Sequence, residues 1–229
     1  MRVASVLAVS LALAGCTQAQ VRLPVALQGA GTAAEFVGIG GKPAGRFTVE
    51  NYSGRFERGL ERAKFLGTIE RSGGARFTIG GPEISSTIEG DCGMREHALD
   101  LGLAEVTVRP LAYCCSFTAE GHAFPARLEL QEVVGGGTAI TRYERRGEIA
   151  LGGEVIQFRS LHHLAGTALP SLTPVGYQFE RGGVAIGALS LTGRPVLTSA
   201  SPEPGVRRTM TIAATALALF WDPAIHDLD

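Results

Sequence analysis

The uncharged run at residues 209–221, TMTIAATALALFW, constrains the fold more than any other feature of this sequence. It contains neither glycine nor proline, and alanine and leucine dominate it, so the helical state is favourable there. Apolar residues cover every side of that helix, which therefore has to be buried all round. Its length would be roughly 20 Å, whereas the hydrocarbon layer of a bilayer is about 30 Å thick. We expect a core helix over about residues 205–221, ended by Asp222 before Pro223, and not a membrane span.

Nearly all of the chain before this run has the pattern of short, half-buried strands. Apolar and polar residues alternate in segments such as 46–50, 75–80 and 154–161. Glycine is abundant, at 31 residues, and the Gly-Gly pair at 182–183 separates two alternating segments as a tight hairpin turn does. Residues 93–102, GMREHALDLG, are the one internal stretch that predicts a helix, of two turns at most.

A closed barrel is the arrangement that buries such a helix on every face, because a flat two-layer arrangement would leave one face in water. A barrel of about eight strands is filled by its own side chains, so a helix inside requires a larger one. We therefore predict a mainly β protein, with a closed antiparallel barrel of about 12 strands around a buried C-terminal helix. The alternative is a β-sandwich with a covering helix. Residues 30–229 would form this single domain.

The order of the elements, with strands and a last helix over residues 30–223, resembles the barrels of the tubby and phospholipid-scramblase-like proteins. The resemblance implies a barrel threaded by its C-terminal helix. The phosphoinositide-binding lysines of that superfamily have no counterpart that can be aligned here, so no functional residue is carried over.

The N-terminus contains a localisation signal. Arg2 is followed by twelve apolar residues, 3–14, which is the size of the hydrophobic region of a signal peptide and too short to span a bilayer. The run ends in LAGC at residues 13–16. These four residues resemble the lipobox of bacterial lipoproteins, in which the signal peptide is removed and the cysteine is lipidated.

The lipobox resemblance implies a signal peptide over 1–15, acylation at Cys16 and a tether over 16–29. More than one acyl chain would make the membrane anchor stable. The residue after Cys16 is Thr17 and not aspartate. In lipoproteins of enteric-type bacteria, the absence of aspartate at this position favours the outer membrane. We therefore expect the protein on the periplasmic face of the outer membrane. The alternative is an ordinary secretory signal that is cleaved nearby.

Three further cysteines, Cys92, Cys114 and Cys115, would lie in a compartment where disulfides persist. Alternate residues of a strand point to the same side. Cys92 then shares the apolar face of segment 84–92, and Cys115 shares the apolar face of segment 111–117. We predict a disulfide between Cys92 and Cys115, with Cys114 on the opposite face; three unpaired cysteines are the alternative.

The sequence contains no recognisable catalytic or metal-binding pattern. His162 and His163 would point to opposite faces of a strand, so they could not easily share one ion. Glu96 and Asp100, which flank His97, have the spacing of a solvated helix face. Neither residue 53 nor residue 190 lies in the G-x-S-x-G pattern of a nucleophile elbow. We predict no catalytic residue, no metal site and no cofactor.

We therefore predict a non-enzymatic envelope lipoprotein, a binding or structural module of unknown ligand. Its partners would be the membrane, through Cys16, and an envelope protein or lipid. The net charge of −1 gives no indication of nucleic-acid binding. The alternative is a lipocalin-like carrier of a hydrophobic small molecule, although the N-terminal Gly-x-Trp signature is absent, since Trp221 is the only tryptophan. An empty volume of several hundred cubic ångströms inside the barrel would favour the carrier.

Overall fold

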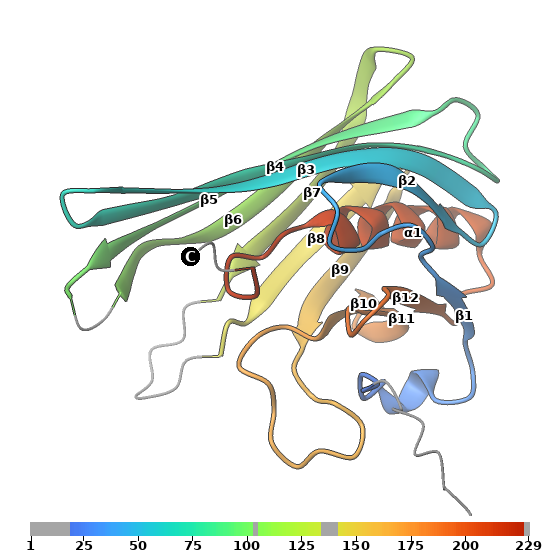
Figure 1. The fold of residues 1–229 in the computed structure, drawn as a ribbon. Coiled ribbons are helices and arrows are strands. Elements are labelled where there is room, and N and C mark those ends of the chain that lie inside the picture. Colours follow the sequence, from blue (N-terminus) through green and yellow to red (C-terminus); the bar gives the residue numbers. More distant parts are fainter. Residues whose placement is uncertain (1–18, 103–104, 134–141, 227–229) are drawn as a thin grey trace, which may run out of the picture.

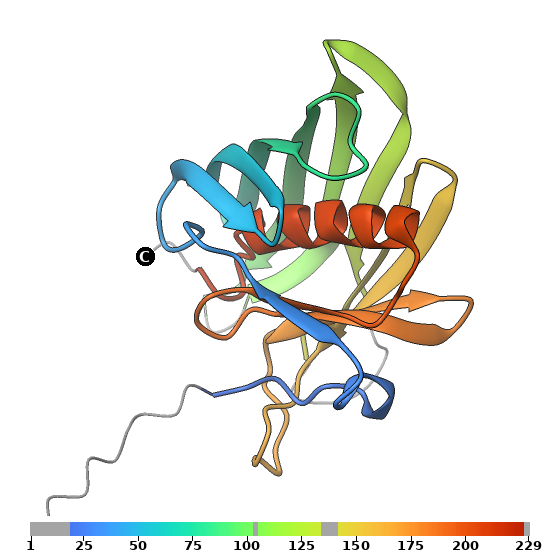
Figure 2. The same ribbon diagram turned by 90° about the vertical axis from the view of Figure 1, so that its right-hand side faces the viewer.

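The computed structural model describes residues 19–102, 105–133 and 142–226. Twelve antiparallel strands form one sheet that curls into a nearly closed barrel, and a C-terminal helix runs through it (Figure 1). Turned by 90°, the molecule shows strands on both sides of this helix (Figure 2). The predicted barrel is confirmed, and the sandwich alternative is wrong because all twelve strands belong to the same sheet.

The sheet follows the order of the chain. Each strand from β2 to β12 pairs with the next, and β1 returns to pair with β12. Val37 and Thr48 close the remaining gap with two backbone hydrogen bonds of 2.9 and 3.0 Å. The bounds are β1 Thr32–Glu35, β2 Ala44–Val49, β3 Tyr52–Phe65, β4 Thr68–Gly80, β5 Ile88–Asp100, β6 Glu105–Ala119, β7 His122–Glu132, β8 Arg145–Leu151, β9 Glu154–Leu161, β10 Gly176–Arg181, β11 Val184–Ser190 and β12 Val196–Ser199, with a short 3-10 helix, η1 Val25–Leu27, before them.

The helix α1 spans Pro204–Leu219, and twelve of its 16 residues are buried. It starts at Pro204 because the fixed φ of proline suits the first helical turn. Glu203 is the N-cap residue, without a side-chain cap. The helix ends one turn earlier than Asp222, since Phe220 already has extended backbone. None of the helices in the described ranges is both long and apolar enough to cross a membrane.

The helix predicted at residues 93–102 is wrong, because this segment belongs to β5. Cys92, Met94, Glu96 and Ala98 are buried, with more exposed residues between them, which is the period of a strand. The segment forms backbone ladders with both β4 and β6. These tertiary contacts outweigh the weak helical preference of so short a sequence.

Glycines facing the interior make room for aromatic rings. A Cβ atom added to Gly90 would lie 2.5 Å from the ring of Phe77, and one added to Gly147 would lie 2.6 Å from the ring of Phe158. In both cases the two residues are directly opposite each other on neighbouring strands. The same pairing recurs for Gly45 with Phe56 and for Gly54 with Phe47. Ring packing thus explains part of the glycine content, in addition to turns.

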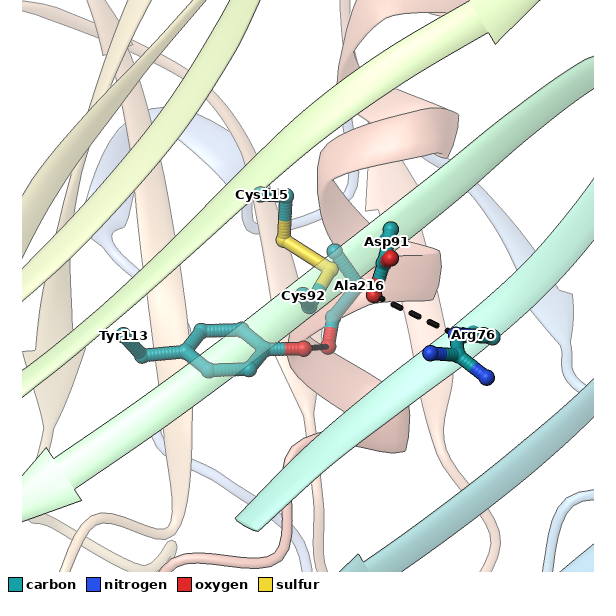
Figure 3. The surroundings of a disulfide bond; sticks show 6 residues. All are labelled: Arg76, Asp91, Cys92, Tyr113, Cys115 and Ala216. Carbon is teal, nitrogen blue, oxygen red and sulfur yellow. Dashed lines mark hydrogen bonds and ion pairs between the residues drawn. A yellow bond between two sulfur atoms is a disulfide. The ribbon is translucent and has the colours of Figure 1, made fainter. Parts of the chain in front are cut away.

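Cys92 and Cys115 form the predicted disulfide, directly opposite each other on β5 and β6, while Cys114 is exposed (Figure 3). Next to the bridge, the Tyr113 hydroxyl donates a hydrogen bond of 3.1 Å to the carbonyl oxygen of Ala216 in α1 (Figure 3). The barrel wall and the helix are therefore joined by a buried polar contact as well as by apolar packing.

The barrel has two ends, which we name after the ends of α1. The Pro204 end carries the β2–β3, β4–β5, β6–β7, β8–β9 and β10–β11 connections. The Leu219 end carries the β1–β2, β3–β4, β5–β6, β7–β8, β9–β10 and β11–β12 connections. Arg208 fixes the first end by donating to the Glu83 carbonyl oxygen in the β4–β5 connection, at 3.3 Å.

Candidate functional site at the Leu219 end

A cavity of about 390 Å³ lies where α1 ends, and we call it the end pocket. The residue after the helix, Phe220, and the next two, Trp221 and Asp222, form one wall. Further lining residues come from strands and connections of the Leu219 end, and they include Gly41, Arg58, Thr173, Tyr177, Leu191, Thr192, Ile225 and His226. Its volume is in the range of small-molecule sites, which is about 300–1,000 Å³.

Arg58 carries the positive charge of the end pocket. Its Nε donates to the Lys42 carbonyl oxygen at 3.1 Å, Nη1 donates to the Ala218 carbonyl oxygen at 3.2 Å, and Nη2 donates to that of Gly40. The guanidinium also lies 4.7 Å from the centre of the Trp221 ring. Burial lowers the pKa of Arg58 to about 10.

No carboxylate lies within 4 Å of Arg58 among the residues that the structure describes. Its hydrogen bonds go to neutral carbonyl oxygens, which include one at the negative end of the helix dipole. A guanidinium has five N–H donors, and the three hydrogen bonds of Arg58 use three of these donors. Arg58 is thus a nearly buried cation with spare donors and no acidic partner.

Arg145, by contrast, is a fully buried cation with two acidic partners. Its Nη1 is 3.2 Å from Glu132 Oε2, and its Nη2 donates to Asp222 Oδ1 at 3.2 Å. Burial opposes the charge of Arg145, but the carboxylates of Asp222 and Glu132 outweigh it and raise its pKa. The pair fixes Asp222, a wall residue of the end pocket, to the first residue of β8.

One carboxylate oxygen near this wall lacks a hydrogen-bond partner in the described part of the chain. Asp222 Oδ2 is buried and makes no hydrogen bond within the described part of the chain. Tyr177 also lines the pocket and is buried, and burial together with the nearby Asp222 carboxylate raises the pKa of its hydroxyl. Trp221 and His226 stack with their ring centres 5.8 Å apart. The pocket therefore combines a cation, hydrogen-bonding groups and aromatic faces.

A second buried charged pair lies in the barrel wall. Glu96 is 5% exposed, and its Oε2 is 3.3 Å from Arg71 Nη1. Burial raises the pKa of Glu96. Arg71 also contacts Glu105 at 2.5 Å. The sequence prediction placed Glu96 and Asp100 on a solvated helix face, which is wrong for Glu96 because it points into the barrel; Asp100 instead pairs with Lys64 at the end of β5.

Of the two adjacent histidines, His162 has both ring nitrogens within hydrogen-bonding distance of other protein groups. His162 is buried, with Nε2 2.9 Å from Ser160 Oγ and Nδ1 3.0 Å from the Ser171 carbonyl oxygen. Sequence reasoning missed this contact between Ser160 and His162. The two residues lie in no nucleophile-elbow pattern, and only one residue stands between them in the sequence. Neither residue lines the end pocket, so we assign the pair a structural role. Over the described ranges, no three His, Cys, Asp and Glu side chains are grouped as metal ligands.

The predictions for the N-terminus and for the family are not tested by the structure. Cys16 and the signal peptide lie outside the described residues. Comparison with protein-family models, with curated proteins and with solved structures finds no match. The resemblance to lipoproteins and to tubby and scramblase-like barrels therefore stays a prediction.

The residues that build the end pocket, above all Arg58 and Asp222, were not predicted as site residues.

Proposed function

We propose that this chain is a lipid-anchored, non-enzymatic protein of the bacterial cell envelope that binds a small molecule in the end pocket. The observation that carries the proposal is that α1 occupies the interior of the barrel, while a cavity with charged and aromatic walls lies at its end. A carrier with a hollow barrel would need its free volume along the axis, where buried helical side chains are packed instead.

The ligand would carry an acidic group. Arg58 lines the cavity, has donors to spare and has no carboxylate neighbour in the described ranges, so an anionic group would supply the missing negative charge. The remaining walls are largely apolar and aromatic, through Phe220, Trp221 and Leu191. A compact carboxylate or phosphate with an apolar body fits both features.

Ligand-observed NMR with a panel of small carboxylates, phosphates and their neutral amide or ester counterparts would test the site. We expect the acidic members to bind and the neutral ones to bind at least tenfold more weakly. Gly41→Phe should abolish binding, because Gly41 lines the pocket and has open space at its Cβ position. Gly93→Phe is the matched control, since Gly93 has equally open space but lies on the outer face of β5, away from the pocket.

Equal binding of neutral and acidic members, or unchanged binding by Gly41→Phe, would contradict the proposed site. A hydrophobic ligand that copurifies with the protein and survives Gly41→Phe would favour the carrier. Mass spectrometry of the mature N-terminus tests the anchor separately: we expect a diacylglyceryl-modified Cys16, and cleavage at another position would contradict it.

A further inference from the structure

Exposed apolar side chains are concentrated at the Leu219 end of the barrel. Of the fourteen large hydrophobic residues that are exposed in the described ranges, ten belong to strands and connections of this end. Two, Val155 and Val184, lie at the Pro204 end. Six of the ten lie on the β3–β4 and β5–β6 hairpins: Phe65, Leu66, Leu99, Leu101, Val106 and Val108.

These two hairpins are next to each other in the sheet and project past the end of α1, at the left of Figure 1. Thr68 of the first hairpin pairs with Leu99 of the second, and Asp100 N donates to the Gly67 carbonyl oxygen at 2.7 Å. The apolar residues therefore form one projecting edge, which we call the hairpin tips. A projecting apolar edge can insert into the interfacial region of a lipid bilayer, whereas protein interfaces usually need a broad complementary surface.

The backbone conformation of the β3–β4 turn is unfavourable for Leu66. Leu66 and Gly67 have φ values of 47° and 76°, so both are in the left-handed region. A two-residue turn of this type favours asparagine followed by glycine, and leucine is strained there. Leu66 is also 88% exposed, so the folded chain gains no packing from it. Leu66 thus lowers the stability of the fold and buries no apolar surface within it. We take this as an indication that Leu66 contacts something other than its own domain.

The N-terminal tether is attached to the same end. Gln20 O accepts from Ala165 N at 2.7 Å, Val21 forms a bridge with Leu164, and Arg22 N donates to the His163 carbonyl oxygen at 2.8 Å. All three contacts are to the β9–β10 connection, at the Leu219 end. Cys16 precedes Gln20 by only four positions, a reach of about 14 Å. A lipid at Cys16 would therefore hold this end close to the bilayer.

We propose that the Leu219 end faces the bilayer and that the hairpin tips insert their apolar side chains among its lipids. The inference rests on the proposed lipid anchor at Cys16. Two of the cations behind the tips are paired with carboxylates, Lys64 with Asp100 and Arg62 with Glu105. Contact is therefore driven by apolar burial, and a zwitterionic lipid surface is sufficient.

Fluorescence quenching in vesicles tests this orientation. The lipidated full chain, with Trp221→Phe to remove the native fluorophore, is reconstituted into phosphatidylcholine vesicles that contain brominated acyl chains. We expect Leu66→Trp to be quenched at least threefold relative to vesicles without bromine. The matched control is Val184→Trp, which is 63% exposed at the Pro204 end and should not be quenched. Equal quenching at both positions, or none at Leu66→Trp, would overturn the orientation.

A second variant separates insertion from folding. Leu66→Asn should keep the fold, because asparagine followed by glycine is preferred in this turn. We expect the unlipidated full chain, with Cys16→Ala, to bind phosphatidylcholine vesicles weakly and Leu66→Asn to reduce that binding at least fivefold. Val184→Asn should leave it unchanged. If Leu66→Asn has no effect, the tips do not contact lipid.

The two proposals can fail independently. A lipidated Cys16 with an unquenched Leu66→Trp would keep the proposed anchor and refute the membrane-facing tips. An unmodified Cys16 in the mature protein would refute the anchor; the vesicle binding of the unlipidated chain then decides the tips alone. A photoreactive group at position 66 that captures an envelope protein, without lipid quenching, would show that a protein partner covers the tips and would refute the lipid contact.

Discussion

Arg58 Nη1 donates a hydrogen bond of 3.2 Å to the carbonyl oxygen of Ala218, which is 160 residues further along the chain. The last carbonyl groups of a helix have no partner within the helix, so a buried helix end needs donors from elsewhere. Arg58 supplies one and also contacts the backbone of residues 40 and 42. One side chain of β3 thereby connects the end of α1 with the connection before β2, and both border the end pocket.

Arg58→Met should lower the free energy of unfolding by about 2–3 kcal/mol, because hydrogen bonds from charged groups contribute about 1.5–3 kcal/mol and buried carbonyl groups would lose their donor. Urea denaturation measures this. Arg55→Met on the same strand is the control: Arg55 is exposed, so its loss should stay within about 0.5 kcal/mol. Similar losses in the two variants would show that Arg58 is not needed to hold the helix end.

Gly90→Ala should destabilise the barrel by about 1–3 kcal/mol, since the added methyl group would overlap the ring of Phe77 at 2.5 Å and overpacking of this size costs that much. Gly93→Ala, three residues later on β5, has no atom within 4 Å of its added Cβ. It should be neutral or slightly stabilising. Urea midpoints of the two variants compare them directly. If Gly90→Ala is as stable as Gly93→Ala, the pairing of glycines with rings is not a packing requirement.

Cys92→Ala combined with Cys115→Ala should lower stability by about 3 kcal/mol, because a bridge across 23 residues restricts the unfolded chain. Cys114→Ser should have an effect within about 0.5 kcal/mol, since Cys114 is exposed and unbridged. Urea denaturation gives both values, and peptide mapping without reductant identifies the bridge. A bridged peptide that contains Cys114 would contradict the assignment.

The fold could be predicted because two signals act over the whole structure. The all-round apolar run at 209–221 has to be enclosed, and the alternation before it supplies the strands. The same alternation assigned Cys92 and Cys115 to one face, and the disulfide follows from it. The segment 93–102 was mistaken for a helix because its alternation is disguised: Glu96 is buried through its pair with Arg71, so a charged residue occupies an inward position.

The end pocket could not be predicted, because its chemistry depends on contacts between distant residues. Arg145 lies in a polar segment, and its burial depends on Asp222, 77 positions later. Asp222 was interpreted only as the end of the helix, whereas the helix ends at Leu219 and Asp222 forms an ion pair with Arg145. Charged residues precede and follow Arg58 in the sequence, so its sequence context resembles that of an exposed strand residue. Only the closure of the barrel brings these groups together.

His162 should make the stability of the protein depend on pH. Burial lowers its pKa below the ordinary value of about 6.5, although the hydrogen bond to the Ser171 carbonyl oxygen opposes this shift. Between the folded and unfolded pKa values the unfolded chain binds more protons at this residue, so the free energy of unfolding rises with pH. The contribution of neutral His162 is complete above about pH 7.5 and is lost as the pH falls through 6.5 and below.

His162→Gln should therefore flatten the decline in stability between about pH 7.5 and pH 5.5, measured by urea denaturation at each pH. The amide of glutamine cannot take up a proton in this range, and it can still bond to Ser160 or to the Ser171 carbonyl oxygen. Glu96, whose pKa burial raises, acts in the opposite direction, because stability from its neutral form declines as the pH rises through its folded pKa. His122→Gln is the control substitution, because His122 is exposed. If His162→Gln keeps the slope of the parent protein, the pH dependence comes from other groups.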